Sequence, residues 1–595
     1  MFAVRRAVGA LFLIASATGV ARAQSSADTV AAELTRIAPT RDGYRVGPIG
    51  LTAAGRGIAA LEPALPALPT QPRIVLVAGL DGSRESTRVV LDVLAWRLAD
   101  ATVVRNRRRW QVAAVPCVLT ERCDPVAAPP FADAPAAPSS AGPVFPPDQG
   151  YFDAPEFREA RYLWRWTTML APDLVIEVRH GTTLEWRGNA LGRPRVSGSG
   201  VAVEDSLAGA LGTGAPGGLA PVAALQVSGP PAEVTRAVRE VLDGRPTPSP
   251  SPLHRALTAR QVRSPLEIAR MLAARYPATP SMSYIPALSW SGALRVSTIT
   301  GDPQYRARAV AQMAPFLSGA KPAIAEPFLL TSLAGHQAFF DLADVEGNRE
   351  ADALARRAAD AILGAAPDEI LGVAPDEIVR FATSWTDDMF MATSVLARAA
   401  KRTGEARYAD AVARLLTSYA ARLQRPDGLF MHAASGPHAW GRGNGFAAFG
   451  LMEALTQLPE SWPARSLVLG SFQRLMSGLR RHQAWDGSWH QVVDEPGTYR
   501  EFTVTAMTVA AMARGLRLGW LDRSFDEVVQ RGWRAVQARV SETGDLVDVC
   551  TGTGAGPNAT REYYLTRPAL FGPDDRGGAM ALTAALEMHA LTGAK

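Results

Sequence analysis

Two patterns of hydrophobic and polar positions divide the chain. Between residues 70 and 243, short runs rich in valine and isoleucine alternate with segments whose apolar residues have helical spacing. From residue 264 onward, apolar residues recur every three or four positions in one segment after another. Strands that alternate with helices predict an α/β domain, whereas repeated amphipathic helices predict an all-α domain. We therefore expect two domains of different fold class.

The first region resolves into short elements. Strands are expected at 73–79, 101–105, 111–115 and 173–180, and helices at 86–98, 155–170 and 232–242. Before this region, residues 24–69 are expected to form an extension with one helix near 28–37 and otherwise loose structure. Residues 124–150 are rich in proline and alanine and are expected to form a loop.

The second region follows a proline-rich segment. Every second residue from Pro246 to Pro252 is a proline. Each proline disfavours helix in its predecessor, so we expect a stiff linker over 244–263. Beyond it, amphipathic helices are expected at 265–276, 304–317, 328–342, 349–363, 389–402, 406–423, 444–456, 466–482, 503–516, 526–540 and 577–591. Such a series over residues 264–595 is typical of stacked helical hairpins that close into an α/α toroid.

Composition and charge exclude some function classes. The 595 residues are 47% hydrophobic and 20% charged, which is a normal globular balance. This length calls for more than one hydrophobic core. Three of the 62 basic residues, Arg5, Arg6 and Arg22, lie at the start of the chain; without them, basic residues exceed the 57 acidic ones by only two. This balance gives no surplus of positive charge for binding nucleic acid.

The first 23 residues have the features of a signal peptide. Two arginines precede an apolar run, and Ala21-Arg22-Ala23 offers small residues for cleavage. The run is short for a membrane anchor, so we expect an exported protein, periplasmic or secreted. The three cysteines, Cys117, Cys123 and Cys550, are too few for a disulfide framework. Cys117 and Cys123 could pair in an oxidising compartment, and their spacing does not suit a structural zinc site.

Two motifs in the helical region carry the most reactive combination of residues. Residues 385–391 read Trp-Thr-Asp-Asp-Met-Phe-Met, and residues 440–446 read Trp-Gly-Arg-Gly-Asn-Gly-Phe. Together they offer carboxylates that can move protons, flat apolar faces and fixed polar donors. This combination suits a sugar ring, so the residues favour a carbohydrate-active enzyme.

The motifs also occur in a recognisable order. Trp-x-Asp with Met-Phe-Met precedes Trp-x-Arg-Gly-Asn-Gly-aromatic, then Asp-Gly-Ser-Trp-His at 486–490 and Cys-Thr-Gly-Thr-Gly at 550–554. In this order the chain resembles the unsaturated uronyl and rhamnogalacturonyl hydrolases of glycoside hydrolase families 88 and 105 over 264–595. The resemblance implies an (α/α)6 toroid with the active site in its funnel, and no cofactor. It also implies removal of a terminal 4,5-unsaturated uronic acid from polysaccharide-lyase products, by hydration of the double bond.

The first motif assigns the acid/base role to Asp387. The implied reaction needs a carboxylic acid that protonates the enol-ether carbon and helps water add, which burial or a nearby like charge favours. Asp388 is adjacent, but neighbours on a helix project about 100° apart, so a shared-proton pair does not follow. Without the resemblance, the alternative is a capping box, Ser384-x-x-Asp387, in which the aspartate only begins a helix.

The resemblance implies a set of substrate-binding residues around this aspartate. The expected residues are Trp385, His432, Trp440, Arg442, Asn444 and Phe446. Arg442 would hold the uronate carboxylate, because a guanidinium fork can bind both oxygens at once. From the residues alone, His432 could equally be a turn histidine and Asn444 a helix cap. Trp485 and Trp489 are further candidates for the funnel wall or for the core.

The chain departs from the family pattern in three places. Residues 500–505, Arg-Glu-Phe-Thr-Val-Thr, lack the serine and small residues that are common in the family after this glutamate. Phe446 stands where tryptophan is usual at the end of the second motif. A second family aspartate is expected near 329–335, but Thr331 and Ser332 stand there instead. This loss keeps open a second function, that of a sugar-binding protein with weak turnover or none.

A fainter resemblance concerns residues 70–243. Residues 78–85 read Ala-Gly-Leu-Asp-Gly-Ser-Arg-Glu after a predicted strand, and a later strand ends at His180. This is similar to the zinc carboxypeptidase core, in which Glu85 and His180 would fit two ligands. Asp81 or Gly82 replaces the first histidine, so we expect a metal-free, degenerate scaffold. The alternative is a zinc peptidase or amidase.

The sequence thus predicts an exported two-domain protein. A carboxypeptidase-like α/β domain over 70–243 is followed by an (α/α)6 glycoside hydrolase domain over 264–595. The expected ligand is an unsaturated uronyl oligosaccharide. Neither nucleic acid nor, after signal cleavage, a membrane is an expected partner.

Overall fold

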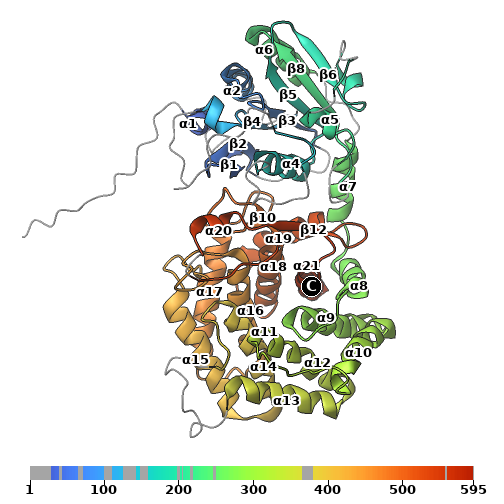
Figure 1. Cartoon of the computed structure of the whole chain (residues 1–595), viewed down its shortest axis with the longest axis vertical. Helices are drawn as coiled ribbons and strands as arrows, with labels where there is room; N and C mark the ends of the chain where they lie inside the picture. Colours follow the sequence, from blue (N-terminus) through green and yellow to red (C-terminus); the bar gives the residue numbers. More distant parts are fainter. Residues whose placement is uncertain are drawn as a thin grey trace, which may run out of the picture.

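The computed structural model describes residues 29–38, 43–64, 71–99, 110–124, 143–147, 158–196, 201–203, 206–214, 219–244, 250–364, 379–556 and 559–593. Within these ranges the chain forms an α/β domain and a larger helical domain, stacked along the long axis of the molecule (Figure 1). The predicted signal peptide, the strand predicted at 101–105 and most of the predicted loop at 124–150 lie outside the described residues.

A mixed eight-stranded sheet forms the centre of the α/β domain. Its strands follow the order β1-β2-β4-β3-β5-β8-β6-β7, and β4, β3, β5 and β8 pair in parallel in its middle. The strands are β1 Tyr44–Leu51, β2 Gly57–Pro63, β3 Arg73–Val77, β4 Gln111–Val115, β5 Leu174–His180, β6 Glu185–Gly188, β7 Val201–Ala202 and β8 Ala224–Gly229.

Helices cover both faces of this sheet. One face carries α1, α2 and α6, and the other carries α4 and the short α5. Their bounds are α1 Val30–Ile37, α2 Arg84–Ala99, α4 Arg158–Leu170, α5 Leu207–Ala210 and α6 Pro231–Asp243. Along β3, Ile74 and Leu76 join the first layer while Val75 and Val77 join the second, as the period of two requires. Parallel strands buried on both faces read as continuous apolar runs, which is why β3, β4 and β5 were predictable.

The expected loose extension at 24–69 is wrong for much of its length. β1 and β2 pair as an antiparallel hairpin, with Tyr44 opposite Pro63, and β2 joins the sheet beside β4. Gly47, Pro48 and Gly50 break the apolar alternation of β1, so the pattern showed no strand. Only the helix predicted near 28–37 is confirmed, as α1.

The short helix α3 Thr120–Cys123 ends in a cysteine that the fold pairs. Cys123 forms a disulfide with Cys117, the pairing that the sequence had left open. Cys550 is a buried free cysteine in the other domain.

The region predicted as a linker contains a helix. α7 Pro252–Gln261 begins after Ser251, whose side chain accepts a hydrogen bond from the His254 amide. A proline in the first helical turn is tolerated because no amide donor is needed there. The Ser251 amide donates to Asp173 Oδ1 at 2.7 Å, and His254 Nδ1 lies 2.9 Å from the same oxygen. This helix is therefore fastened to the α/β domain.

Two concentric rings of helices form the second domain in the described part of the chain. In the inner ring, α9 packs against α12, α12 against α14, α14 against α16, α16 against α18, α18 against α21, and α21 returns to α9. Each outer helix packs against an inner helix adjacent to it in the chain. The inner helices are α9 Tyr284–Thr300, α12 Gln337–Glu346, α14 Asp387–Thr403, α16 Gly441–Gln457, α18 Phe502–Arg517 and α21 Asp575–Gly593; the outer ones are α8 Pro265–Arg275, α10 Pro303–Leu317, α13 Arg349–Leu363, α15 Ala406–Leu423, α17 Arg465–Arg481 and α19 Asp526–Arg539. The closed inner ring confirms the predicted (α/α)6 toroid.

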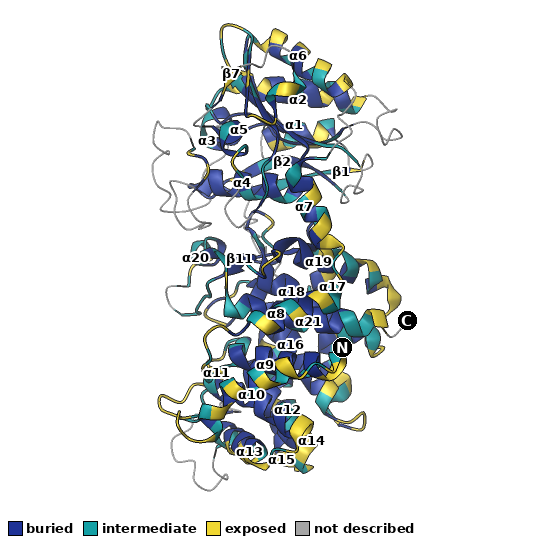
Figure 2. Ribbon diagram, turned by 90° about the vertical axis from the view of Figure 1, so that its right-hand side faces the viewer, coloured by how far each residue is buried: buried dark blue, intermediate teal, exposed yellow. Residues whose placement is uncertain are grey.

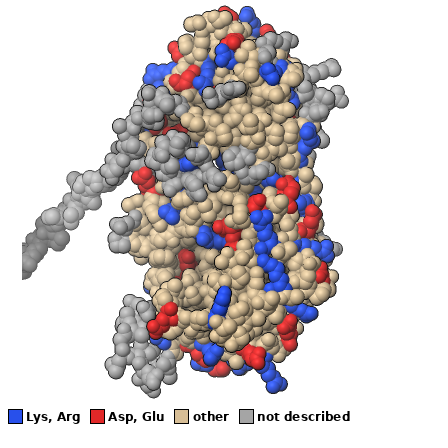
Figure 3. Space-filling model, turned by 45° about the vertical axis from the view of Figure 1, so that its right-hand side comes forward, with Lys and Arg blue, Asp and Glu red and all other residues tan. Residues whose placement is uncertain are grey.

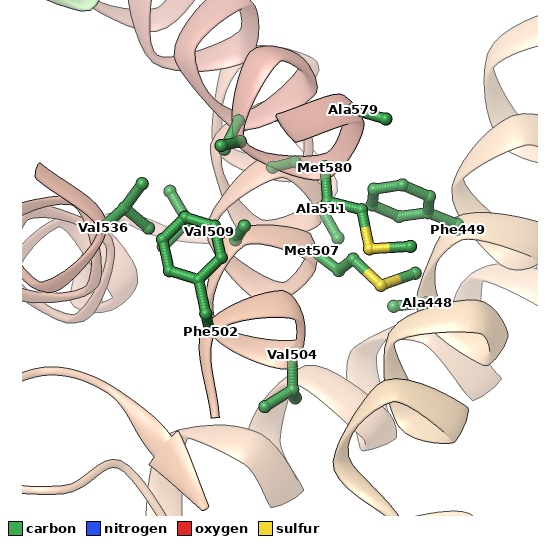
Figure 4. Packing of buried hydrophobic residues seen from close by; sticks show 14 of the residues in the cluster. Ala448, Phe449, Phe502, Val504, Met507, Val509, Ala511, Val536, Ala579 and Met580 are labelled. Carbon is green, nitrogen blue, oxygen red and sulfur yellow. The ribbon is translucent and has the colours of Figure 1, made fainter. Parts of the chain in front are cut away.

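Burial separates the inner helices from the outer ones. Figure 2 shows the centre of the helical domain buried and its outer helices striped with exposed residues. Figure 4 shows α18 in this core: Met507 points toward Ala448 and Phe449 of α16, Met580 of α21 lies near Met507, and Val536 of α19 lies on the opposite side of α18. The inner helix α9 was not predicted, because a helix buried all round has no polar stripe. The outer helices keep that stripe, and their prediction is confirmed.

Short strands, which the sequence pattern did not show, lie at one end of the helical domain. β9 Trp489–His490 pairs with β10 Arg500–Glu501, and β11 Leu546–Cys550 pairs with β12 Ala569–Gly572. With the short helix α20 Arg561–Leu565, these strands lie where the helical domain faces the α/β domain (Figure 1).

Most of the face in Figure 3 carries no charged side chain. On the right-hand side of its lower half, several Lys and Arg side chains form a run, with Asp and Glu beside it. Among the described helices, none combines the length and the apolar character that crossing a membrane requires.

Candidate active site

Asp387 begins α14 at the N-terminal end of an inner helix. The preceding residue, Thr386, makes no side-chain capping bond, and Ser384 has a left-handed backbone with a φ of 62°. The capping box that the sequence allowed is therefore not formed. The Asp387 side chain keeps 18% of its surface exposed. Its carboxylate is therefore accessible and does not serve as a helix cap.

Asp388, in contrast, is bound into the protein. Its carboxylate accepts hydrogen bonds from the Thr383 amide at 2.8 Å, from Thr383 Oγ1 at 3.0 Å and from the Tyr419 hydroxyl at 2.7 Å. Burial raises the pKa of Asp388 to about 6, and the nearby charge of Asp387 adds to this rise. The two carboxylates bind different partners, so they do not form a shared-proton pair.

His432 connects Asp387 to Tyr564. Its Nε2 lies 3.2 Å from Asp387 Oδ2, and its Nδ1 lies 2.7 Å from the Tyr564 hydroxyl. The imidazole is fully buried, and the rings of Trp385, Trp440 and Tyr564 surround it at centroid distances of 5.3, 4.7 and 5.7 Å. The histidine is thus held in one orientation by aromatic packing and by both of its ring nitrogens.

This chain of hydrogen bonds suits either protonation state of the aspartate. When Asp387 is ionised, Nε2–H of His432 donates to it and Nδ1 accepts the tyrosine O–H. When Asp387 is protonated, its O–H donates to Nε2, and Nδ1–H donates to Tyr564. A carboxyl group that alternates between acid and base therefore keeps a partner, and its orientation, throughout.

The second motif begins the inner helix α16. Trp440 is the N-cap residue, and Arg442 is the second residue of the helix. Each is 2% exposed, and the guanidinium carbon lies 5.1 Å from the centre of the indole. Burial opposes the charge of Arg442, but nearby negative groups, among them Glu501 and Asp387, more than offset it and raise its pKa. A buried, permanently charged cation thus stands within electrostatic reach of Asp387.

The fourth motif closes over the first two. Arg442 Nη1 donates to the Cys550 carbonyl at 2.9 Å. A Cβ placed on Gly552 would lie 3.4 Å from Arg442 Nη2, and one on Gly554 would lie 3.6 Å from the Trp385 ring. Three motifs that are far apart in the sequence therefore meet at the N-terminal ends of α14 and α16.

Two of the predicted binding residues serve the packing instead. Asn444 is fully buried, and its amide bonds only backbone groups in the described structure, those of Phe430 and Trp440 at 2.8 to 3.0 Å. Phe446 is 1% exposed and packs on Tyr284 and Phe390 at centroid distances of 5.5 and 6.1 Å. Both were assigned to the substrate because they share a motif with Arg442, but their side chains leave the site.

The third motif also lies away from Asp387. Trp489 is fully buried and donates Nε1–H to the Leu479 carbonyl at 2.7 Å. Trp485 donates to Glu62 of the α/β domain at 2.6 Å. Of the two alternatives that the sequence left open for these tryptophans, funnel wall or core, the structure therefore shows the core.

The start of α12 carries no replacement for the missing second aspartate. Residues 329–340 contain neither Asp nor Glu; Thr331 is exposed, and Ser332 is partly buried. Two further residues of the site were not predicted: Tyr564, which orients His432, and Tyr284, whose environment includes both Arg442 and Asp387. Both tyrosines lie outside the motifs, so no local signal marked them.

The candidate zinc ligands of the α/β domain do not form a metal site. Asp81 accepts from the Ser83 amide at 2.9 Å, from Ser86 Oγ at 3.0 Å and from the His180 amide at 2.8 Å. It therefore ties the end of β3 to the end of β5. Among the described residues, no group of three or more His, Cys, Asp or Glu is placed to hold a metal ion.

Known proteins resemble the helical domain. The unsaturated rhamnogalacturonyl hydrolase YesR of Bacillus subtilis (strain 168) is 28% identical over 185 residues, which are 30% of this chain and 52% of that protein. An unsaturated 3S-rhamnoglycuronyl hydrolase of Alteromonas sp. (strain LOR) is 28% identical over 191 residues, 30% of this chain and 46% of that protein. The chain thus spans about half the length of these curated relatives.

A solved structure and a family pattern cover more of the chain. A family 105 glycoside hydrolase from C. acetobutylicum ATCC 824 is 20% identical, with a TM-score of 0.49, over 55% of this chain and 100% of that one. The sequence pattern of Glycosyl Hydrolase Family 88 matches residues 267–592. This match spans the whole ring of helices and the site at the start of α14, and through it the chain belongs to Glycosyl Hydrolase Family 88.

Proposed function

We propose that this protein is a glycoside hydrolase that removes a terminal 4,5-unsaturated uronic acid from the products of polysaccharide lyases. The observation that carries the proposal is the hydrogen-bonded series Asp387–His432–Tyr564 beside the buried cation Arg442. The names of the relatives, an unsaturated rhamnogalacturonyl hydrolase and an unsaturated 3S-rhamnoglycuronyl hydrolase, support the same substrate class.

The residues have separate roles in this reaction. Asp387 protonates C4 of the double bond and then helps a water molecule to add at C5. The resulting hemiketal collapses and releases the aglycone. His432 and Tyr564 keep the carboxyl group oriented before and after it loses its proton. Arg442 provides positive charge for the uronate carboxylate, and Trp385, which stays partly exposed beside His432, offers an apolar face to the sugar.

The test uses the ultraviolet absorbance of the unsaturated uronate. The purified protein should bleach a lyase digest of pectin or of a glycosaminoglycan, and Asp387→Asn should slow bleaching by about 10²- to 10⁴-fold, the usual contribution of a general acid/base. The matched control is Asp410→Asn on the exposed side of α15, which should leave the rate unchanged. Equal rates for the wild type and Asp387→Asn would falsify the mechanism.

A second candidate function rests on the missing aspartate. Because no carboxylate stands at residues 329–340, the toroid could bind unsaturated oligosaccharides without turning them over. Saturable binding measured by calorimetry, together with no bleaching on any digest, would favour this function. Bleaching that is lost in Asp387→Asn would remove it.

A further inference from the structure

A buried carboxylate joins the two domains. Glu62 on β2 accepts hydrogen bonds from Trp166 Nε1 at 2.6 Å and from Arg45 at 3.1 Å within its own domain. From the helical domain, Glu62 accepts hydrogen bonds from Trp485 Nε1 at 2.6 Å and from Arg500 at 2.7 Å. Burial alone would raise the pKa of Glu62, but Arg500 and Arg45 outweigh it and lower the pKa, so the group stays ionised. Glu62 is therefore a charged centre shared by both domains.

A second ion pair crosses the same junction. Arg165 on α4 places its Nε 2.9 Å from Asp548 Oδ1 on β11, with side-chain exposures of only 12% and 2%. Asp548 has a left-handed backbone with a φ of 64°, and the pairing of β11 with β12 shifts register at this residue. A left-handed aspartate needs support from its surroundings, and Arg165 supplies part of it.

Both contacts are connected, through neighbouring residues, to Arg442 of the candidate site. Arg500 precedes Glu501, whose carboxylate caps α18 and accepts the Cys550 amide at 2.9 Å. Cys550 also lies two residues after Asp548. Its carbonyl accepts a hydrogen bond from Arg442 Nη1 at 2.9 Å. The α/β domain therefore contacts β10 and β11, and these strands contain Cys550 and the Glu501 carboxylate that binds its amide.

We propose that the α/β domain is a positioning domain for Arg442, with Glu62 and Arg165 as its positioning residues. They hold the strands β10 and β11 in place. Through the Cys550 carbonyl, these strands orient the Arg442 guanidinium. The role of Arg442 in holding a uronate carboxylate rests on the proposed function; the mechanical coupling does not. This gives the domain a function that requires no metal and no reaction of its own.

The alternative is that the junction only attaches one domain to the other. In that case, loosening it would lower stability without changing the local order of residues 546–552 or the affinity for an acidic sugar. The two ideas therefore differ in local hydrogen exchange and in KM, which are the quantities to measure.

The experiment uses the full chain with Glu62→Gln and, separately, Arg165→Met. Hydrogen exchange at the Cys550 and Thr551 amides should become about tenfold faster, which is the effect expected from losing one charge-assisted hydrogen bond. KM for the lyase digest should rise by a similar factor while kcat changes less. The matched controls are Glu185→Gln and Arg187→Met, an exposed pair on β6 outside the junction, and both readouts should match the wild type.

Three outcomes decide the proposal. Unchanged exchange over 546–552 in both variants overturns it, whether or not the wild type shows turnover. Exchange that rises equally over the whole chain also overturns it, since only global stability has then changed. Faster local exchange in a protein that bleaches no digest supports the positioning domain and refutes the proposed function instead. If Glu62→Gln does not fold, Arg165→Met and Asp548→Asn, which keeps the left-handed backbone accessible, carry the test.

Discussion

At the scale of single residues, two neighbouring aspartates have different environments. Asp387 and Asp388 are adjacent and both stand in the first turn of α14. One turns toward His432 and stays partly open, while the other is buried beneath Thr383 and Tyr419. The difference arises from the angle between consecutive side chains on a helix, so residue type alone does not distinguish the accessible carboxylate from the buried one.

The buried aspartate makes stability depend on pH. Its folded pKa of about 6 lies above the ordinary value of roughly 4, so the native state binds the proton more tightly than the unfolded state does. The stabilising contribution of this proton is complete below about pH 4 and is lost as the pH rises through about 6, by on the order of 3 kcal/mol. In the Asp388→Asn variant, the free energy of unfolding should decrease less than in the wild type between about pH 4 and about pH 6.

Urea unfolding at a series of pH values measures this difference. Asp410→Asn on the surface of α15 is the control, and its profile should run parallel to that of the wild type. The account fails if the profiles of Asp388→Asn and the wild type are parallel as well.

At the scale of elements, α16 is shaped by its glycines. A Cβ on Gly450 would lie 2.2 Å from the Met389 carbonyl oxygen of α14, and one on Gly443 would lie 2.8 Å from Thr386 Oγ1. Glycine within a helix costs about 1 kcal/mol relative to alanine; at these two positions it permits the close approach of α14 and α16. That approach brings Asp387, at the start of one helix, to Arg442 at the start of the other.

Adding one methyl group to this contact should therefore be harmful. Gly450→Ala should lower the free energy of unfolding by about 1–3 kcal/mol, the usual range for overpacking, because the added carbon meets backbone that cannot move aside. The matched control is Gly470→Ala on the outer helix α17, where a Cβ would lie 3.5 Å from the end of a flexible arginine. That change should be neutral or slightly stabilising. Equal stability for both variants, measured by chemical denaturation, would contradict the packing account.

At the scale of the whole molecule, one hydrophobic core crosses the domain boundary. Tyr162 and Trp166 of α4 belong to the same buried cluster as Trp485 and Phe502 of the helical domain. A large apolar interface opposes independent domain motion, and the buried ion pairs at Glu62 and Asp548 add to it. The two domains should therefore behave as one body.

This predicts one cooperative unfolding transition for the full chain. Calorimetry should give a single peak, and tryptophan fluorescence and circular dichroism should report the same midpoint, as two-state unfolding requires. Glu62→Gln, which weakens the junction, should split or broaden the transition, while Glu185→Gln should not. Two separate transitions in the wild type would show that the domains unfold independently.

The fold was predictable where a pattern is written in consecutive residues. Continuous apolar runs marked β3 and β5, and polar stripes marked outer helices such as α13 and α15. The inner helix α9 has no stripe, and the strand β1 contains glycine and proline, so neither could be identified locally. At the site, Asp387, Trp440 and Arg442 were predicted from their motifs and His432 from the family resemblance, whereas Tyr564 was not predicted.

The sequence by itself determined the order of the two domains, the helical periodicity of the second and the residue types available for chemistry, because these depend on local spacing. Only the tertiary structure decided which of those residues face one another. It placed His432 between Asp387 and Tyr564, turned Asn444 and Phe446 into the packing, and drew Trp485 to a glutamate in the other domain. These contacts join residues distant in the chain, and only the closed ring of helices and the domain docked on it bring them together.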